Sequence, residues 1–160
     1  MGTTILIPTD FNVSSLEPLK ALLQFQNEDS MNVLLVHGIY QSNSISDLLF
    51  FDQNDLKMEL AGKKFLSKLY DLEKELGSKV ESIQITFFSG LTQSSFEQFT
   101  ETNKVDRIII PYELTFDWSH KKSMDVLPFL HKSKIKKQLI AWDNNQYSNK
   151  SNQVIVTAIA

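Results

Sequence analysis

The chain has 160 residues, no cysteine, and 16 Lys and Arg against 19 Asp and Glu, which gives a net charge of −3. This length predicts one compact domain, and the absence of cysteine excludes disulfides, thiolate catalysis and cysteine-rich metal sites. The slightly acidic balance provides no general positive field for a nucleic acid backbone, so we expect no nucleic acid partner.

Short apolar runs alternate with helical periodicity along the chain. This alternation is typical of βα units around a mostly parallel sheet with helices on both faces. The predicted strands are Thr4–Pro8, Asn32–His37, Val80–Phe88, Asp106–Pro111 and Lys137–Trp142. After a polar segment rich in Asn, Ser and Gln, the apolar run Val154–Ile159 predicts an extra C-terminal strand. We therefore predict a single α/β domain over residues 1–142, and a linker with a terminal strand over residues 143–160.

Four helices are predicted between these strands. They span Ser15–Gln26, about Asn54–Leu76, about Ser95–Asn103 and part of Lys121–Lys132. In the last of them, Pro128 should kink the helix or delay its start. The second and longest helix carries an apolar stripe that we expect to face the sheet, formed by Met58, Gly62, Phe65, Leu69, Leu72 and Leu76.

The composition of the strands also predicts their order. Continuous apolar runs are typical of strands covered on both faces, and they occur at Ile5–Ile7, Val33–Val36 and Ile108–Ile110. The strand Val80–Phe88 alternates apolar and polar residues, as an edge strand does. These patterns favour the order 3-2-1-4-5 over the flavodoxin order 2-1-3-4-5. Open α/β sheets bind ligands where the order reverses, so we expect a site at Pro8–Phe11 and Pro111–Glu113.

A distinctive pattern ends the first two predicted strands. Pro8-Thr9-Asp10-Phe11 ends the first, a serine soon opens the next helix, and Val36-His37 ends the second. This pattern resembles the universal stress protein (UspA-like) family. The resemblance implies a Rossmann-like fold of the adenine nucleotide alpha hydrolase type, with the order 3-2-1-4-5. It also implies a non-enzymatic role in the stress response and homodimers formed through the last strand.

Many members of that family bind ATP with the Asp that ends strand 1 and a glycine-rich stretch after strand 4. At the matching glycine positions this chain has Pro111, Leu114 and Met124, and Asp125 replaces the hydroxyl residue. Glycine lets backbone N–H groups approach a phosphate closely, whereas proline has no N–H and Asp125 would repel the anion. We therefore expect a degenerate member that binds no ATP and uses no cofactor.

Three histidines, His37, His120 and His131, are the only bases that titrate near neutral pH. The sequence shows no set of nucleophile, base and orienting acid, so we expect no catalytic residues and no enzyme, with an undetected hydrolase as a remote alternative. His37 ends a buried strand and is expected to be a hydrogen-bonded structural residue. The spacing of His120 and His131 does not fit a helical metal motif, so no metal site is expected.

The predicted cleft between strands 1 and 4 leaves two interpretations open. Its expected ligand-binding residues are Pro8, Thr9, Asp10, Ile39, Pro111 and Tyr112. Asp10 either anchors the loop and caps a helix, or it contacts a ligand. In the second case, the alternative function is binding of an adenine-like or other flat molecule without a polyphosphate.

Two apolar segments and one basic segment remain. Leu48–Phe51 is expected either to cover the cleft or to contact a partner, and Val154–Ile159 to extend a sheet edge of its own chain or of a second subunit. A homodimer through the fifth strand, the terminal strand or both is the expected assembly. The basic run His131–Lys137 predicts a solvated helix end. No apolar stretch is long enough to span a membrane, so we expect a soluble cytoplasmic protein.

Overall fold

The computed structural model describes residues 2–16, 19, 31–40, 52–77, 80–111, 115–141 and 155–159. The strands are β1 (Thr4–Pro8), β2 (Met31–Ile39), β3 (Val80–Phe88), β4 (Arg107–Pro111), β5 (Ser123–Met124), β6 (Lys136–Ala141) and β7 (Ile155–Ile159). The helical elements are the 3₁₀ helix η1 (Val13–Leu16) and the α-helices α3 (Gln53–Leu76), α4 (Gln93–Thr102) and α5 (Leu127–Lys132).

The described strands form one sheet in the order β3-β2-β1-β4-β6-β7, and β5 pairs with β2 away from this path. The pairs from β3 to β6 are parallel, so the predicted order 3-2-1-4-5 is confirmed, with β6 as the fifth predicted strand. The alternating strand β3 lies at the edge, as its pattern predicts. The expected terminal strand is β7, which is antiparallel to β6.

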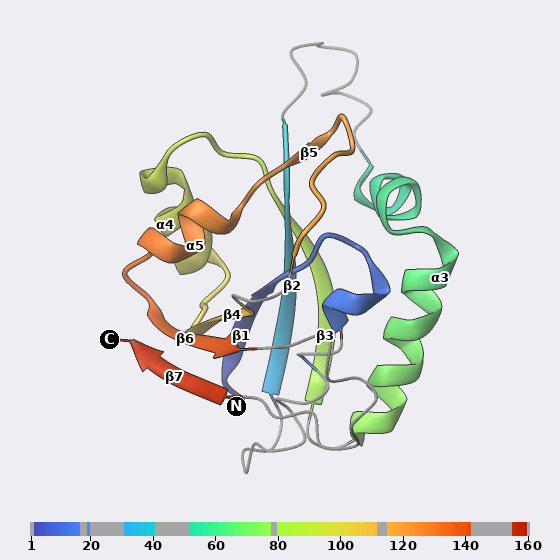
Figure 1. Cartoon of the computed structure of the whole chain (residues 1–160), viewed down its shortest axis with the longest axis horizontal. Coiled ribbons are helices and arrows are strands. Elements are labelled where there is room, and N and C mark those ends of the chain that lie inside the picture. The colour runs from blue at the N-terminus through green and yellow to red at the C-terminus, as the bar shows by residue number, and fades with distance from the viewer. Residues whose placement is uncertain are drawn as a thin grey trace.

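Helices cover both faces of the sheet, with α3 on one side and α4 and α5 on the other (Figure 1). The central strand β1 therefore contributes to two cores. Ile5 and Ile7 pack in the cluster that includes the α3 residue Phe65, whereas Leu6 packs in the cluster that includes the α4 residue Phe96. This division explains why consecutive residues of β1 are all apolar.

Helix α3 differs from the predicted amphipathic helix in its first half. Asp52 caps its start, since the carboxylate accepts a hydrogen bond of 2.8 Å from the Asn54 backbone N–H. Gly62 then has φ 74° and ψ 170°, which breaks the helix in two. The predicted stripe holds from Phe65 onward, but Met58 is 51% exposed. The break changes the direction of the helix axis, so one stripe cannot continue across it; glycine permits this backbone conformation because it has no Cβ.

The fourth predicted helix is shorter than Lys121–Lys132. It begins at Leu127, with Pro128 in its first turn, so the proline delays the start as expected. The residues before it form β5, in which Ser123 and Met124 pair antiparallel with Ile39 and Gly38 of β2. This short strand is not predicted by the sequence pattern.

Some expectations fall on parts of the chain that are not described. The helix predicted over Ser15–Gln26 lies mostly there, as do the segment Leu48–Phe51 and the polar linker at residues 143–154. No helix within the described ranges is both long and apolar enough to cross a membrane.

Candidate functional site

The loop that follows β1 is fixed by its own hydrogen bonds. Thr9 is fully buried, and its backbone N–H donates to the Val36 carbonyl at 2.9 Å. Its hydroxyl lies 2.8 Å from the Ser15 hydroxyl and accepts from the Phe11 backbone N–H at 3.1 Å. Phe11 has a positive φ of 66°, which turns the chain sharply after the strand. We call the carboxyl ends of β1, β2 and β4, together with Thr9–Asn12, the mouth of the sheet.

The carboxylate of Asp10 lies in this mouth, and three N–H donors surround it. Oδ1 accepts from the Asn12 backbone N–H at 3.0 Å, and Oδ2 accepts from the Asn12 side-chain amide at 2.9 Å. Oδ2 also accepts from the backbone N–H of Asp117 at 2.8 Å, across 107 residues of sequence. Asp10 therefore joins the loop after β1 to the segment after β4, a contact that agrees with the first of the two roles its position allows.

That segment, residues 115–124, crosses the mouth, and we call it the strap (Figure 1). Besides Asp117, it places Trp118 with its ring centroid 5.3 Å from that of His37. Phe116 stacks on Trp118 at 5.5 Å with an interplanar angle of 19°. The strap ends in β5, and just before β5 the Lys122 carbonyl accepts a hydrogen bond of 3.0 Å from the Tyr40 N–H. The strap is thus fixed to β2 at one end and to Asp10 at the other.

His37 lies beneath the strap and is almost fully buried. Its Nδ1 is 2.8 Å from the Thr9 carbonyl oxygen, and its Nε2 is 2.7 Å from the Ser123 hydroxyl. Because a carbonyl only accepts, Nδ1 carries the proton, and Nε2 of the neutral ring accepts from Ser123. Burial lowers the pKa of His37 below 6.5, and His120 lowers this pKa further by a smaller amount. The hydrogen bond to the Thr9 carbonyl and the negative charge of Asp10 raise the pKa, but by less than burial lowers it. His37 is therefore neutral at neutral pH, and both of its ring nitrogens are hydrogen-bonded, as the sequence predicts.

The Ser123–His37 distance matches that of a nucleophile and its base, but the surroundings favour a structural pair. Ser123 is 6% exposed and belongs to β5. Its N–H donates to the His120 carbonyl, and the neighbouring Tyr40 N–H donates to Lys122. Neither amide is therefore available to stabilise a developing oxyanion.

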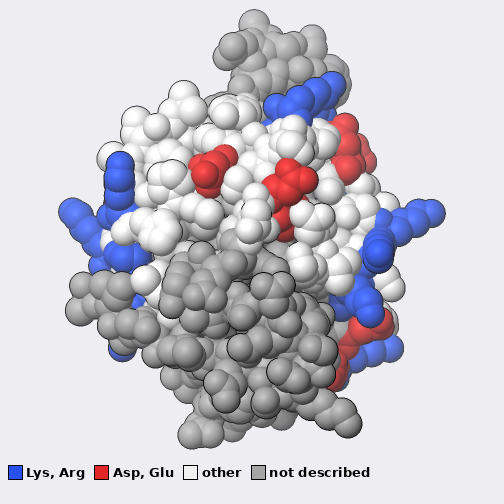
Figure 2. Space-filling view, in the orientation of Figure 1, with Lys and Arg blue, Asp and Glu red and all other residues white. Residues whose placement is uncertain are grey.

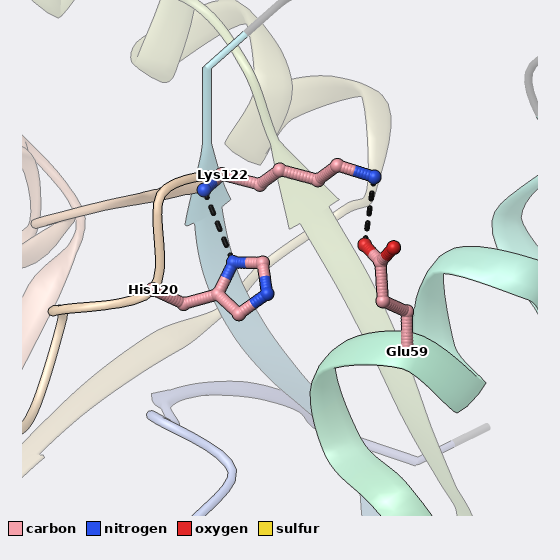
Figure 3. Close-up of polar contacts among 3 residues, drawn as sticks. All are labelled: Glu59, His120 and Lys122. Carbon is pink, nitrogen blue, oxygen red and sulfur yellow. Dashed lines mark hydrogen bonds and ion pairs between the residues drawn. The ribbon is translucent and has the colours of Figure 1, made fainter.

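The strap also contacts helix α3 through an ion pair (Figure 3). The Lys122 ammonium is 2.7 Å from Glu59 Oε2, and both side chains are about half exposed. The hydrogen bond from Lys122 lowers the pKa of the Glu59 carboxyl below its usual value. The Lys122 backbone N–H donates to Nδ1 of His120 at 3.1 Å, which fixes the orientation of that ring.

The predicted cleft residues are only partly brought together. Pro8, Thr9 and Asp10 lie at the end of β1, and Pro111 ends β4. Ile39 is 6% exposed and pairs with β5, so the strap covers it. Tyr112 lies outside the described residues. No sequence pattern marks Asp117, Trp118 and Ser123 as site residues, because residues 115–120 match no predicted element and a helix is predicted within residues 121–132.

Other charged groups show no second site. In the part of the chain that the structure describes, no group of three or more His, Asp or Glu side chains could hold a metal ion. His131 and Lys132 occupy the last turn of α5 and are exposed, as expected for a solvated helix end. Figure 2 shows basic side chains without acidic neighbours at the left edge of this face, on the side of α4 and α5.

At the level of sequence, no family model and no curated protein matches this chain. Solved structures do match. The universal stress protein UspA from Lactobacillus plantarum is 10% identical, with 86% of this chain and 96% of that one covered and a TM-score of 0.53. A universal stress protein family protein from Arabidopsis thaliana, with AMP bound, is 12% identical, with coverage of 92% and 97% and a TM-score of 0.52. The hypothetical protein MJ0577 is 24% identical, with coverage of 90% and 99% and a TM-score of 0.50. The chain therefore has the universal stress protein fold, as the residues at the ends of its first two strands predict.

Proposed function

We propose that this chain is a non-enzymatic regulatory module of the universal stress protein type, acting as a cytoplasmic homodimer without bound ATP. The observation that carries the proposal is the hydrogen bond from the Asp117 N–H to the Asp10 carboxylate. Asp10 is the acid that the family resemblance associates with adenosine. Here a backbone N–H of the same chain donates to this carboxylate, which supports a mouth covered by the strap and not by a nucleotide.

The residues at the expected phosphate positions support the same proposal. Pro111 ends β4 and has no N–H to offer. Met124 is 7% exposed within β5, so its backbone is engaged in the sheet. Asp125 accepts a hydrogen bond of 2.9 Å from the Leu127 N–H at the start of α5, and its charge would repel a phosphate. A phosphate would therefore meet a negative charge where glycine amides would bind it.

The proposal predicts that nucleotides with a polyphosphate do not stabilise the protein. Adding Mg-ATP should leave the melting temperature unchanged, and calorimetry should detect no binding of micromolar affinity. Adenosine and AMP serve as matched ligands without a triphosphate. Stabilisation by ATP beyond that given by AMP would contradict the proposal, whereas equal stabilisation by adenosine and AMP would favour the alternative of a small flat ligand.

A panel of generic esters and nucleotides should show no turnover.

The homodimer is proposed from the edge of the sheet. The outer side of β6 pairs with β7 of the same chain, so β7 is the last strand of the described sheet on that side. An edge strand presents unpaired backbone groups to another chain. Light scattering of the full chain should therefore give a dimer, and truncation after Trp142 should weaken it. Circular dichroism would establish that the truncated chain is folded, and a folded truncation with an unchanged dimer would remove β7 from the interface.

A further inference from the structure

We propose that the strap is a proton-controlled cover, closed over the mouth of the sheet while His37 is neutral and released when His37 binds a second proton. This goes beyond the proposed function, because it holds whether or not the mouth receives a ligand. The inference starts from the position of His37, whose ring connects the strap to the rest of the domain.

Each side of the His37 ring contacts a different part of the chain. Nδ1 donates to the loop after β1, and Nε2 accepts from Ser123 of the strap. The Phe11 ring lies 4.4 Å from His37 and the Trp118 ring 5.3 Å, measured between centroids. His37 is only 1% exposed, so it presents almost no surface to water that could solvate a charge. The closed strap is therefore built for a neutral imidazole.

A second proton on His37 reverses the hydrogen bond to the strap. Nε2 becomes a donor, so the Ser123 hydroxyl must turn to accept and find another acceptor for its own proton. The new positive charge is also buried, which is costly unless a partner compensates it. The ring is therefore driven toward water.

The charges around the ring do not remove this cost. The Asp10 carboxylate attracts a proton on His37, but it already accepts three hydrogen bonds. His120 opposes a charge on His37. From β3, the neighbouring ring is the uncharged Phe87, with centroids 6.3 Å apart. The remaining charged groups of the strap and of the facing part of α3 are Asp117, Lys121, Lys122 and Glu59, and Lys122 and Glu59 neutralise each other.

The strap is the side of this arrangement that opens most easily. Phe11 belongs to a buried core and packs edge-on against Phe65, with ring centroids 5.3 Å apart. Trp118 is only partly buried, and β5 pairs with β2 through two residues. Segments with few buried contacts open at lower free energy than core elements. Release of the strap therefore hydrates His37 at the cost of the two-residue pairing of β5 and the burial of Met124, while the parallel strands stay paired.

The direction of the pH dependence follows from linkage. In the closed form, burial lowers the pKa of His37 below 6.5, and exposure of the ring returns it toward that value. Between these two values the open form binds more protons, so each unit of decreasing pH favours opening by up to about tenfold. Above pH 6.5 the full preference for the closed form is retained.

Trp118 reports on the strap directly. The chain has two tryptophans, so Trp142→Phe leaves Trp118 as the only one. We expect its emission maximum to shift to longer wavelength and its quenching by acrylamide to increase from about pH 8 to about pH 5. Far-UV circular dichroism should stay constant over this range. The same change should persist in His131→Gln, because His131 is exposed on α5.

His37→Gln is the decisive variant, since glutamine is neutral and keeps both a donor and an acceptor. The pH-dependent shift of Trp118 emission should disappear in it. NMR titration of the His37 ring in the Trp142→Phe protein gives an independent measurement that does not require the variant to fold. The proposal is overturned if Trp118 emission stays constant down to pH 5, or if its shift accompanies a loss of far-UV circular dichroism. It is also overturned if the emission shift survives in His37→Gln, or if the His37 ring titrates outside the pH range of the emission change.

Discussion

Gly38→Ala is expected to separate β5 from β2 and to lower the free energy of unfolding by about 1–3 kcal/mol. A Cβ on Gly38 would overlap the Met124 carbonyl oxygen and lie 3.2 Å from its carbonyl carbon. These are backbone atoms of β5, so they cannot move away without breaking the pairing of the two strands. Urea titration measures the loss of stability, and Trp118 emission in the Trp142→Phe protein measures the displacement of the strap.

Gly90→Ala is the matched control for this variant. Gly90 follows the neighbouring strand β3, and its added Cβ would meet the Ser95 Cβ at 2.7 Å and the Phe88 ring at 2.8 Å. These are side-chain atoms of β3 and α4, not backbone atoms of the strap, although Phe88 packs in the same cluster as Met124. Because side chains can adjust without separating β5 from β2, Gly90→Ala should shift Trp118 emission less than Gly38→Ala does. If Gly38→Ala shifted the emission no more than Gly90→Ala, the close approach of β5 to β2 would not hold the strap in place.

Asp10→Ala should lower the free energy of unfolding of the ligand-free protein by about 2–3 kcal/mol. The change removes the acceptor of three hydrogen bonds and leaves the backbone N–H groups of Asn12 and Asp117 without it. Hydrogen bonds to a charged group are stronger than neutral ones, and this carboxylate is 9% exposed. Urea or thermal unfolding without added ligand measures the effect.

Asp106→Ala provides the comparison at the opposite end of the sheet. Its exposed carboxylate accepts one hydrogen bond, from the Thr4 backbone N–H at 2.8 Å. Loss of a single exposed bond should cost less than loss of the buried Asp10 interactions. Equal losses in the two variants would indicate that Asp10 does not anchor the strap, and a ligand-binding role would then be the better interpretation.

The order of the sheet could be predicted because each strand's environment is visible in its own residues. Ile5, Leu6 and Ile7 are consecutive apolar residues, and the structure places them in two cores on opposite faces. Ile83 and Ile85 alternate with the polar Gln84, as in a strand at an edge. Burial on one face or on both therefore determines a pattern that a single sequence shows.

The strap could not be predicted in the same way. Its central contact uses the backbone N–H of Asp117, which almost any residue type could supply, so no sequence signal marks it. β5 contains only Ser123 and Met124, too few residues for periodicity, and it depends on the close approach of Gly38. The sequence pattern ends the second strand at His37, whereas β2 continues through Gly38 to Ile39. Contacts between distant segments decide these features.

The break at Gly62 gives the two halves of α3 different partners. The second half contributes Phe65, Leu69, Leu72 and Leu76 to the core and is held there. The first half carries the exposed Met58 and reaches Lys122 through Glu59, although Leu60 and Ala61 still pack against the core. The direction of the first half of α3 is therefore set partly by its ion pair with the segment that crosses the carboxyl ends of the strands, whereas the second half is set by the core.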